Sequence, residues 1–247
     1  MYPVECRTWE QLLDAEDVEL PQNSMKMDCH DFYFQKPRTS TLQLDLAMSS
    51  MKKGGFKLAA FGTSMPTIFN LKAGHSEAIC VKRVYNTVER VVEVGGTLRK
   101  KIVNVPHEGE KQSQYLMMEV TCLVWAQALL GIVYDFIEAE SQGYGAKLPF
   151  NIPQFCYVNV AIAIENSIPS KKTTFLLEEL IDADIEGPFR KYLNNVSPMP
   201  LTMETKEDEE RAKFLAFTQH VQYWKTKKQA FVSDYQGMLI VCFTNPR

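Results

Sequence analysis

The end of the chain carries the pattern from which the rest can be interpreted: FVSDYQG at Phe231–Gly237, an apolar run at Met238–Phe243, and TNPR at Thr244–Arg247. Two β-type runs therefore flank a polar turn. Because side chains alternate along an extended chain, Asp234 and Gln236 are expected to point the same way. A carboxylate and an amide placed side by side can orient a hydroxyl or bind a hard cation. On these residues alone, a plain β-hairpin with a polar turn remains the alternative.

The composition is that of a soluble globular protein, since 45% of the 247 residues are hydrophobic and 23% are charged. A net charge of −3 argues against a protein that coats nucleic acid, so no nucleic-acid partner is expected. The four histidines lie far apart in the sequence and show no metal-type spacing with the cysteines.

Several features indicate an intracellular, cytoplasmic protein. The six cysteines form no C-x-x-C pair, so no disulfide framework is expected. The acidic N-terminus does not resemble a signal peptide. The longest apolar stretch, Val120–Tyr134, is read as too short and too polar to cross a bilayer, so no membrane partner is expected.

The first half of the chain contains two strands that suit a phosphate site. Met1–Ser50 shows no sustained period and is interpreted as an N-terminal extension. Gly54 and Gly55 then precede a strand at Phe56–Phe61, and a second strand, Glu77–Tyr85, contains Lys82. Glycines let backbone amides approach a phosphate closely, and a lysine adds a positive charge. A lysine on a solvated strand edge is the alternative.

The remaining elements complete an α+β pattern. Apolar residues at three- and four-residue steps predict a long helix over Gln112–Ala139. Further strands are predicted within Val88–Gln112, Pro153–Ile164 and Thr173–Leu177, and a second helix at Glu207–Lys227, whose acidic first turn suits the helix dipole.

In this order, the segments resemble the alpha-type protein kinases, which are atypical serine/threonine kinases, and most closely their fungal members. Gly187–Asn195 is close to the family's G-x-F-x-K-Y-x-x-N, and Asp234–Gly237 matches its D-x-Q-G. The other matching segments are Gly54–Ala59, Val81–Arg83, Leu177–Ile181, Ala216–Phe217 and Thr244–Pro246.

The resemblance implies a two-lobed, atypical protein-kinase-like fold. A twisted antiparallel sheet with a long helix would form the N-lobe, at about residues 51–182, and a small C-lobe would follow at about residues 183–247. Residues 1–50 would lie outside the kinase domain. The family continues into a zinc module with His and Cys ligands, whereas this chain stops at Arg247 without such a ligand set. A truncated C-lobe without zinc is therefore expected.

The resemblance also implies how ATP is bound. Lys82 would contact the α- and β-phosphates, with Gly54, Gly55 and Lys57 close to the phosphates. Glu178 would lie at the hinge and offer its backbone to the adenine ring.

At the end of the chain, the resemblance implies the catalytic and metal-binding residues. Asp234 would orient the substrate hydroxyl and accept its proton, and Lys191 would contribute to ATP binding. Gln236 and Asn245 would hold Mg²⁺, although the family has an aspartate where this chain has Asn245.

Two functions stay open at this point. The first is an ATP-dependent protein serine/threonine kinase that uses Mg²⁺. The alternative is a weak or inactive pseudokinase that serves as a nucleotide-binding or scaffold module.

Overall fold

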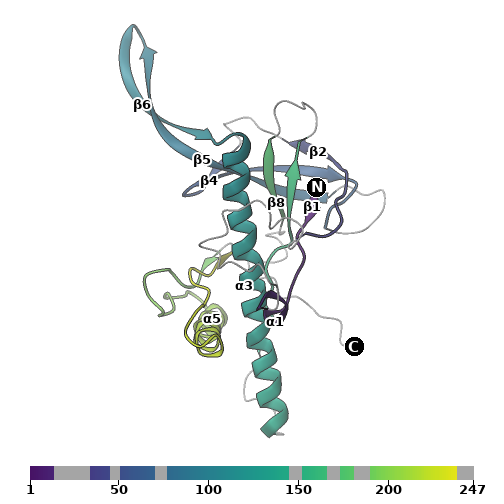
Figure 1. The fold of residues 1–247 in the computed structure, drawn as a ribbon. Coiled ribbons are helices and arrows are strands. Elements are labelled where there is room, and N and C mark those ends of the chain that lie inside the picture. Colours follow the sequence, from purple (N-terminus) through teal and green to yellow (C-terminus); the bar gives the residue numbers. More distant parts are fainter. Residues whose placement is uncertain are drawn as a thin grey trace. The chain divides into compact units, whose positions relative to one another are not determined.

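The computed structural model describes residues 1–13, 34–44, 51–69, 77–144, 152–165, 173–180 and 190–237. It combines a curved antiparallel sheet with two long helices (Figure 1). The chain divides into two compact units. Unit 1 comprises residues 1–5, 19–121 and 158–180, and unit 2 comprises residues 6–18, 122–157 and 181–247.

Within the described ranges, the sheet of unit 1 has eight antiparallel strands, in the order β1-β7-β8-β5-β4-β2, with β3 paired to β4 and β6 paired to β5. This confirms the predicted antiparallel sheet and the α+β class. Its strands are β1 (Tyr2–Pro3), β2 (Thr41–Leu44), β3 (Lys52–Lys53), β4 (Lys57–Met65), β5 (Glu77–Val94), β6 (Thr97–Pro106), β7 (Val160–Ile164) and β8 (Thr174–Glu179).

The two faces of the sheet differ in chemistry. One face forms a core in which Val81, Phe175 and Leu177 pack with Ile79, Ala161 and Ala163. Because side chains alternate, the neighbouring residues Lys82 and Glu178 lie on the opposite face. The pairing of β5 between β4 and β8 therefore places charged side chains from three strands on one surface.

Strand β5 is longer than predicted. The predicted strand ended at Tyr85, whereas β5 continues to Val94 and returns as β6 through Gly95 and Gly96. Both glycines have positive φ, of 60° and 76°, as the tight turns favoured in β-hairpins require. Residues 85–106 thus form a two-stranded hairpin (Figure 1).

Helix α3 (Gly109–Tyr144) confirms the predicted long helix and extends it at both ends. Leu116, Val120, Val124 and Ala128 are buried as expected, whereas Tyr115 is exposed. The statement that its apolar stretch is too short to cross a bilayer is wrong, because Gly109–Gln142 is long and apolar enough to do so. More than half of its most apolar window is buried against protein, as in the core helix of a soluble protein.

Unit 2 contains α1 (Trp9–Leu13), the second half of α3, α5 (Lys206–Lys225) and a small sheet of β9 (Arg190–Lys191) with β10 (Gln236–Gly237). Helix α5 confirms the predicted second helix. The core of this unit is formed by Leu130, Phe155, Tyr192, Leu193, Ala212, Phe214, Leu215 and Tyr235. Through Tyr192 and Tyr235, which adjoin β9 and β10, this core holds the small sheet against α5.

Segment 1–50 and Cys156 both differ from the simple picture that the sequence suggests. The segment 1–50 contributes β1 and β2 to the sheet, so part of it belongs to unit 1, and a domain boundary at residue 51 stays a prediction. Cys156 takes part in a disulfide, contrary to the expectation from cysteine spacing.

Candidate functional site

Lys82 and Glu178 form an ion pair on the charged face of the sheet. Lys82 on β5 lies opposite Leu176 on β8, and Glu178 is two residues further along β8, so both side chains share one face. The Lys82 Nζ lies 2.5 Å from the Glu178 Oε2, and both side chains are largely covered. A charge pair placed this way holds the lysine ammonium in a fixed direction.

Glu178 lies within an interior strand of the sheet. Strand β8 lies between β5 and β7, where Glu178 opposes Cys80 and Val160. The backbone of an interior strand is already engaged in the sheet, so the side chain is the part of Glu178 that is free to act. Its role at an adenine hinge stays a prediction.

Two more lysines lie on the same face as Lys82. Ala59 on β4 lies opposite Lys82 on one side and Lys52 on the other, so Lys52 shares the face of Lys82. Lys57 precedes Ala59 by two residues on β4 and therefore shares this face as well. The Lys57 Nζ lies 2.6 Å from the Glu119 Oε2 on α3. Burial and the charge of Glu178 raise the pKa of the Cys80 thiol, which lies two residues before Lys82 on β5 and stays neutral.

The glycine turn between β3 and β4 is held by Tyr85. The buried Tyr85 hydroxyl donates to the carbonyl oxygens of Gly54 and Gly55, at 2.8 and 2.9 Å. The Gly54 amide donates to the Lys57 carbonyl, and the Tyr85 amide donates to the Phe56 carbonyl. A single residue on β5 therefore fixes the turn next to the lysine face.

In unit 2, Asp234 has an unusual backbone conformation. Its φ is +60°, in the left-handed region that non-glycine residues other than Asn and Asp rarely adopt. Such outliers are often found at functional sites, because the surrounding structure must maintain them. Here the neighbouring Tyr235 does so: its carbonyl accepts from the Tyr192 amide, and its buried hydroxyl accepts from Thr218 and Gln222.

Lys191 is the charge partner of Asp234. The Lys191 Nζ lies 2.6 Å from the Asp234 Oδ1, while both side chains stay partly exposed. This oxygen is shielded from solvent but accepts no well-aligned hydrogen bond from any described residue. The contact is therefore an ion pair, and the Asp234 side chain as a whole stays partly exposed.

Asp208 at the start of α5 holds the residues on either side of Lys191. Its carboxylate accepts from the Tyr192 hydroxyl at 3.2 Å and lies 3.2 Å from the Arg190 Nε. Thr205, the N-cap of α5, accepts from the Asp208 amide and donates to its carboxylate. Strand β9 is thus fixed to the first turn of the helix.

The charge of Asp208 is maintained by these contacts. Burial raises the pKa of its carboxyl, but hydrogen bonds from Thr205 and Tyr192 and the charges of Arg190 and Arg211 outweigh burial, so the net pKa is lowered. A lowered folded-state pKa adds stability above the unfolded-state pKa of about 3.9, and this stability is lost as the pH falls through the folded-state pKa.

Replacing Asp208 with asparagine is therefore expected to lower the free energy of unfolding by about 2 kcal/mol at pH 7. The difference from the wild type should shrink below about pH 4, where the wild-type carboxyl takes up a proton. Urea unfolding followed by circular dichroism between pH 3 and 7 measures this. Glu209→Gln, which changes an exposed carboxylate one residue further along α5, should change stability little. A constant difference at every pH would contradict the assignment.

The predicted metal ligands are only partly described. Gln236 lies on β10 opposite Lys191, but nothing is described of its side chain. Asn245 lies outside the described residues. Within the described ranges, no group of three His, Cys, Asp or Glu side chains is arranged to hold a metal ion.

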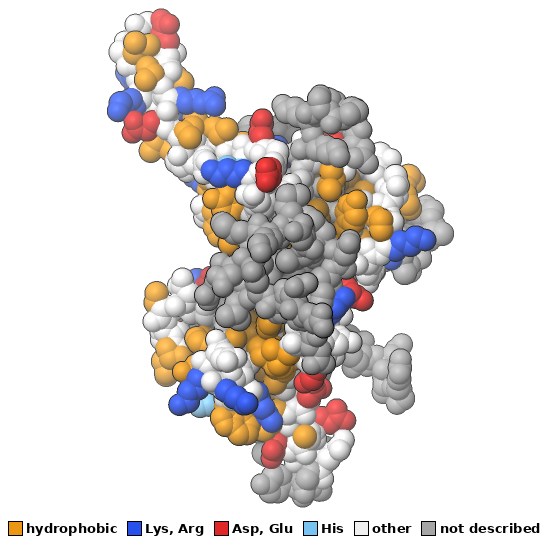
Figure 2. Space-filling view, in the orientation of Figure 1, with side chains coloured by type: hydrophobic (Ala, Val, Ile, Leu, Met, Phe, Trp, Pro, Cys, Tyr) orange, Lys and Arg blue, Asp and Glu red, His pale blue; other side chains and the backbone are white. Residues whose placement is uncertain are grey.

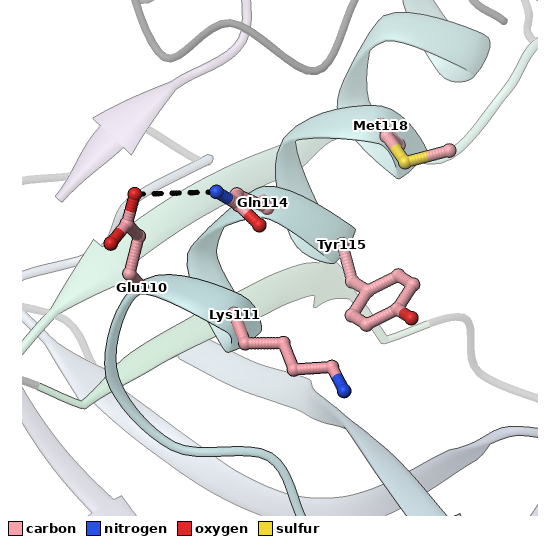
Figure 3. Close-up of a pocket in the computed structure, with 5 residues that line it drawn as sticks. All are labelled: Glu110, Lys111, Gln114, Tyr115 and Met118. Atoms are coloured by element: carbon pink, nitrogen blue, oxygen red, sulfur yellow. Dashed lines mark hydrogen bonds between the residues drawn. The ribbon is translucent and has the colours of Figure 1, made fainter.

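A surface pocket lies elsewhere in unit 1. It is lined by residues from the first turns of α3 (Figure 3), namely Glu110, Lys111, Gln114, Tyr115 and Met118. None of the predicted site residues lines it.

Four residues around these sites were missed in the sequence: Lys52, Tyr85, Glu119 and Asp208. Only Asp208 had a local signal, because Thr205 and Asp208 have the three-residue spacing of a helix cap. The other three depend on pairing between distant segments.

Comparison with protein-family models matches residues 66–247 to the model described as the alpha-kinase family. The matched range contains Lys82, Glu178, Lys191, Asp234, Gln236 and Asn245, whereas Gly54, Gly55 and Lys57 precede it. Comparisons with curated proteins and with solved structures gave no match.

Proposed function

This chain belongs to the alpha-kinase family, and we propose that it transfers the γ-phosphate of ATP to a serine or threonine hydroxyl of an intracellular protein, with Mg²⁺ as cofactor. Family membership supports a protein kinase function and a kinase-like α+β fold. The use of ATP and Mg²⁺, the choice of hydroxyl and the catalytic competence of this chain are our proposal.

The Lys82–Glu178 pair is the observation that carries the proposal. It lies on the sheet face that also bears Lys57 and Lys52, beside the glycine turn held by Tyr85. A triphosphate carries three to four negative charges, so several lysines on one surface suit it. Lys82 and Lys57 would bind the phosphates, and Glu178 would orient Lys82. Unlike the hinge role implied by the resemblance, this role uses the Glu178 side chain.

Asp234 suits the chemistry of transfer. Its carboxylate would accept the proton of the substrate hydroxyl as the hydroxyl oxygen bonds to the γ-phosphorus and the bond to the β–γ bridging oxygen breaks, releasing ADP. Lys191, which pairs with this carboxylate, would offset charge on the phosphoryl group.

Mg²⁺ neutralises charge on the β- and γ-phosphates when it is bound. Oxygen ligands are what it prefers, and Asp234, Gln236 and Asn245 would supply a carboxylate and two amides. With one carboxylate among the three, binding is expected to depend on the phosphates as well as on the protein.

The test is phosphate transfer by the purified chain. The chain is incubated with γ-labelled ATP, Mg²⁺ and a mixed serine/threonine protein substrate, and the labelled residue is identified by mass spectrometry. Transfer that needs Mg²⁺ supports the proposal. The absence of both transfer and thermal stabilisation by Mg-ATP would contradict it. Stabilisation without transfer would assign the chain a nucleotide-binding role in place of catalysis.

A further inference from the structure

The β5–β6 hairpin exposes hydrophobic side chains far more than a sheet interior does. Val91, Leu98 and Ile102 are exposed by 62%, 72% and 66%. Figure 2 shows hydrophobic and Lys or Arg side chains together on this hairpin, at the upper left. A two-stranded hairpin without a packed face is marginally stable in water, so its retained apolar surface suggests a partner.

The strand register separates the hairpin into two faces. Val91 opposes Lys100, Glu93 opposes Leu98, and Glu89 opposes Ile102, so these six side chains lie on one face. The Lys100 Nζ lies 3.0 Å from the Glu89 Oε2, which agrees with this arrangement. This surface, the apolar face, combines three hydrophobic side chains with two carboxylates and one lysine.

The charges on the other surface, the basic face, are all positive, and they lie beside the partly buried Val88, Val92 and Val103. Arg90 opposes Lys101, and Val92 opposes Arg99. The side chains of Arg90, Arg99 and Lys101 are all exposed, and none of them forms an ion pair with a described residue. The chain as a whole has a net charge of −3, so this local concentration of cations runs against the overall composition.

The hairpin also has a free edge. Among the described strands, β6 pairs with β5 alone, which leaves the outer backbone groups of Thr97–Pro106 unpaired. Exposed edges can accept a further strand, and charges such as Arg99 and Lys101 discourage pairing with most sequences. A strand that neutralises these charges is the exception.

We propose that the β6 edge binds an extended peptide in which acidic and apolar residues alternate. In a β-strand, alternate side chains point to opposite faces. An added strand would therefore place its apolar residues beside Val91, Leu98 and Ile102 and its acidic residues beside Arg90, Arg99 and Lys101. This proposal stands on the hairpin alone and does not depend on kinase activity.

Nucleic acid is the other polyanion that a basic β-ribbon can contact, because a two-stranded ribbon fits the major groove. The apolar face disfavours it, since a groove offers no counterpart to three hydrophobic side chains. The peptide also uses the free edge, which a duplex does not.

Fluorescence anisotropy with the full chain tests the proposal. The probe is a labelled octapeptide that alternates glutamate and valine, and the comparison peptide has four glutamates followed by four valines. We expect the alternating peptide to bind about tenfold more tightly than the block peptide. Arg99→Glu with Lys101→Glu should weaken binding about tenfold or more. The same should hold for Leu98→Thr with Ile102→Thr, which alters only the apolar face.

Matched charge reversal on α5, Lys206→Glu with Lys213→Glu, should leave binding unchanged, and circular dichroism verifies that each variant is folded. Equal binding of the two peptides, or no binding of either at millimolar concentration, would overturn the proposal. It would also be overturned if a twenty-base-pair duplex bound more tightly than the alternating peptide.

Discussion

Replacing Asp234 with asparagine is expected to lower kcat for phosphate transfer about 10²- to 10⁴-fold, the range typical of losing a general base. Asparagine has nearly the same shape as aspartate but cannot accept the hydroxyl proton. It also removes the charge that pairs with Lys191. Since both of these side chains are partly exposed, the free energy of unfolding should change little.

The choice of asparagine matters because of the backbone. At φ +60°, alanine would add about 1 kcal/mol of strain, whereas asparagine adopts this region readily. The Asp234→Asn variant therefore separates catalysis from folding in a way that alanine does not. Initial rates with γ-labelled ATP measure kcat, and thermal unfolding measures stability.

Glu209→Gln is the control for this variant, because it makes the same chemical change on the exposed surface of α5. It should leave the rate unchanged. An Asp234→Asn protein with the kcat of the wild type would remove Asp234 from the catalytic step and leave its backbone conformation as a structural feature only.

The elements of the fold were predictable where one face of an element is buried. The spacing of Leu116, Val120 and Val124 predicted α3 because these side chains are fully covered. Beyond Tyr85, β5 and β6 confirm the strands predicted within Val88–Gln112, but the continuity of β5 from Glu77 to Val94 was missed, since the hairpin has no packed face to impose a regular apolar pattern. The Gly95-Gly96 pair was the available signal for its turn.

The candidate sites were predictable only in part. Motif resemblance located Lys82, Lys191 and Asp234, and the structure gives each a charge partner. The motif resemblance did not identify Glu119 as the partner of Lys57. That pair joins residues 62 positions apart through the packing of α3 on the sheet. The Lys82–Glu178 pair likewise arises from the register of β5 and β8, which a sequence alone leaves open.

Replacing Lys82 with methionine is expected to abolish thermal stabilisation by Mg-ATP and to lower kcat/KM about 10²-fold or more. Methionine keeps a long unbranched side chain, but the positive charge for the phosphates is lost. The change also leaves the largely covered Glu178 carboxylate without its partner, which should cost about 3 kcal/mol of stability. A loss of stability in the single variant would therefore not show by itself whether Lys82 binds ATP.

The double variant, Lys82→Met with Glu178→Gln, resolves this ambiguity. Glutamine removes the unpaired charge, so stability should return toward that of the wild type, while ATP binding should stay lost. Glu178→Gln alone keeps the Lys82 ammonium but removes its orienting charge, and about tenfold weaker ATP binding is expected. Thermal shift with and without Mg-ATP measures stability and binding in the same samples. If the double variant regained both, Lys82 would be a structural partner of Glu178, and the phosphates would have to be bound elsewhere.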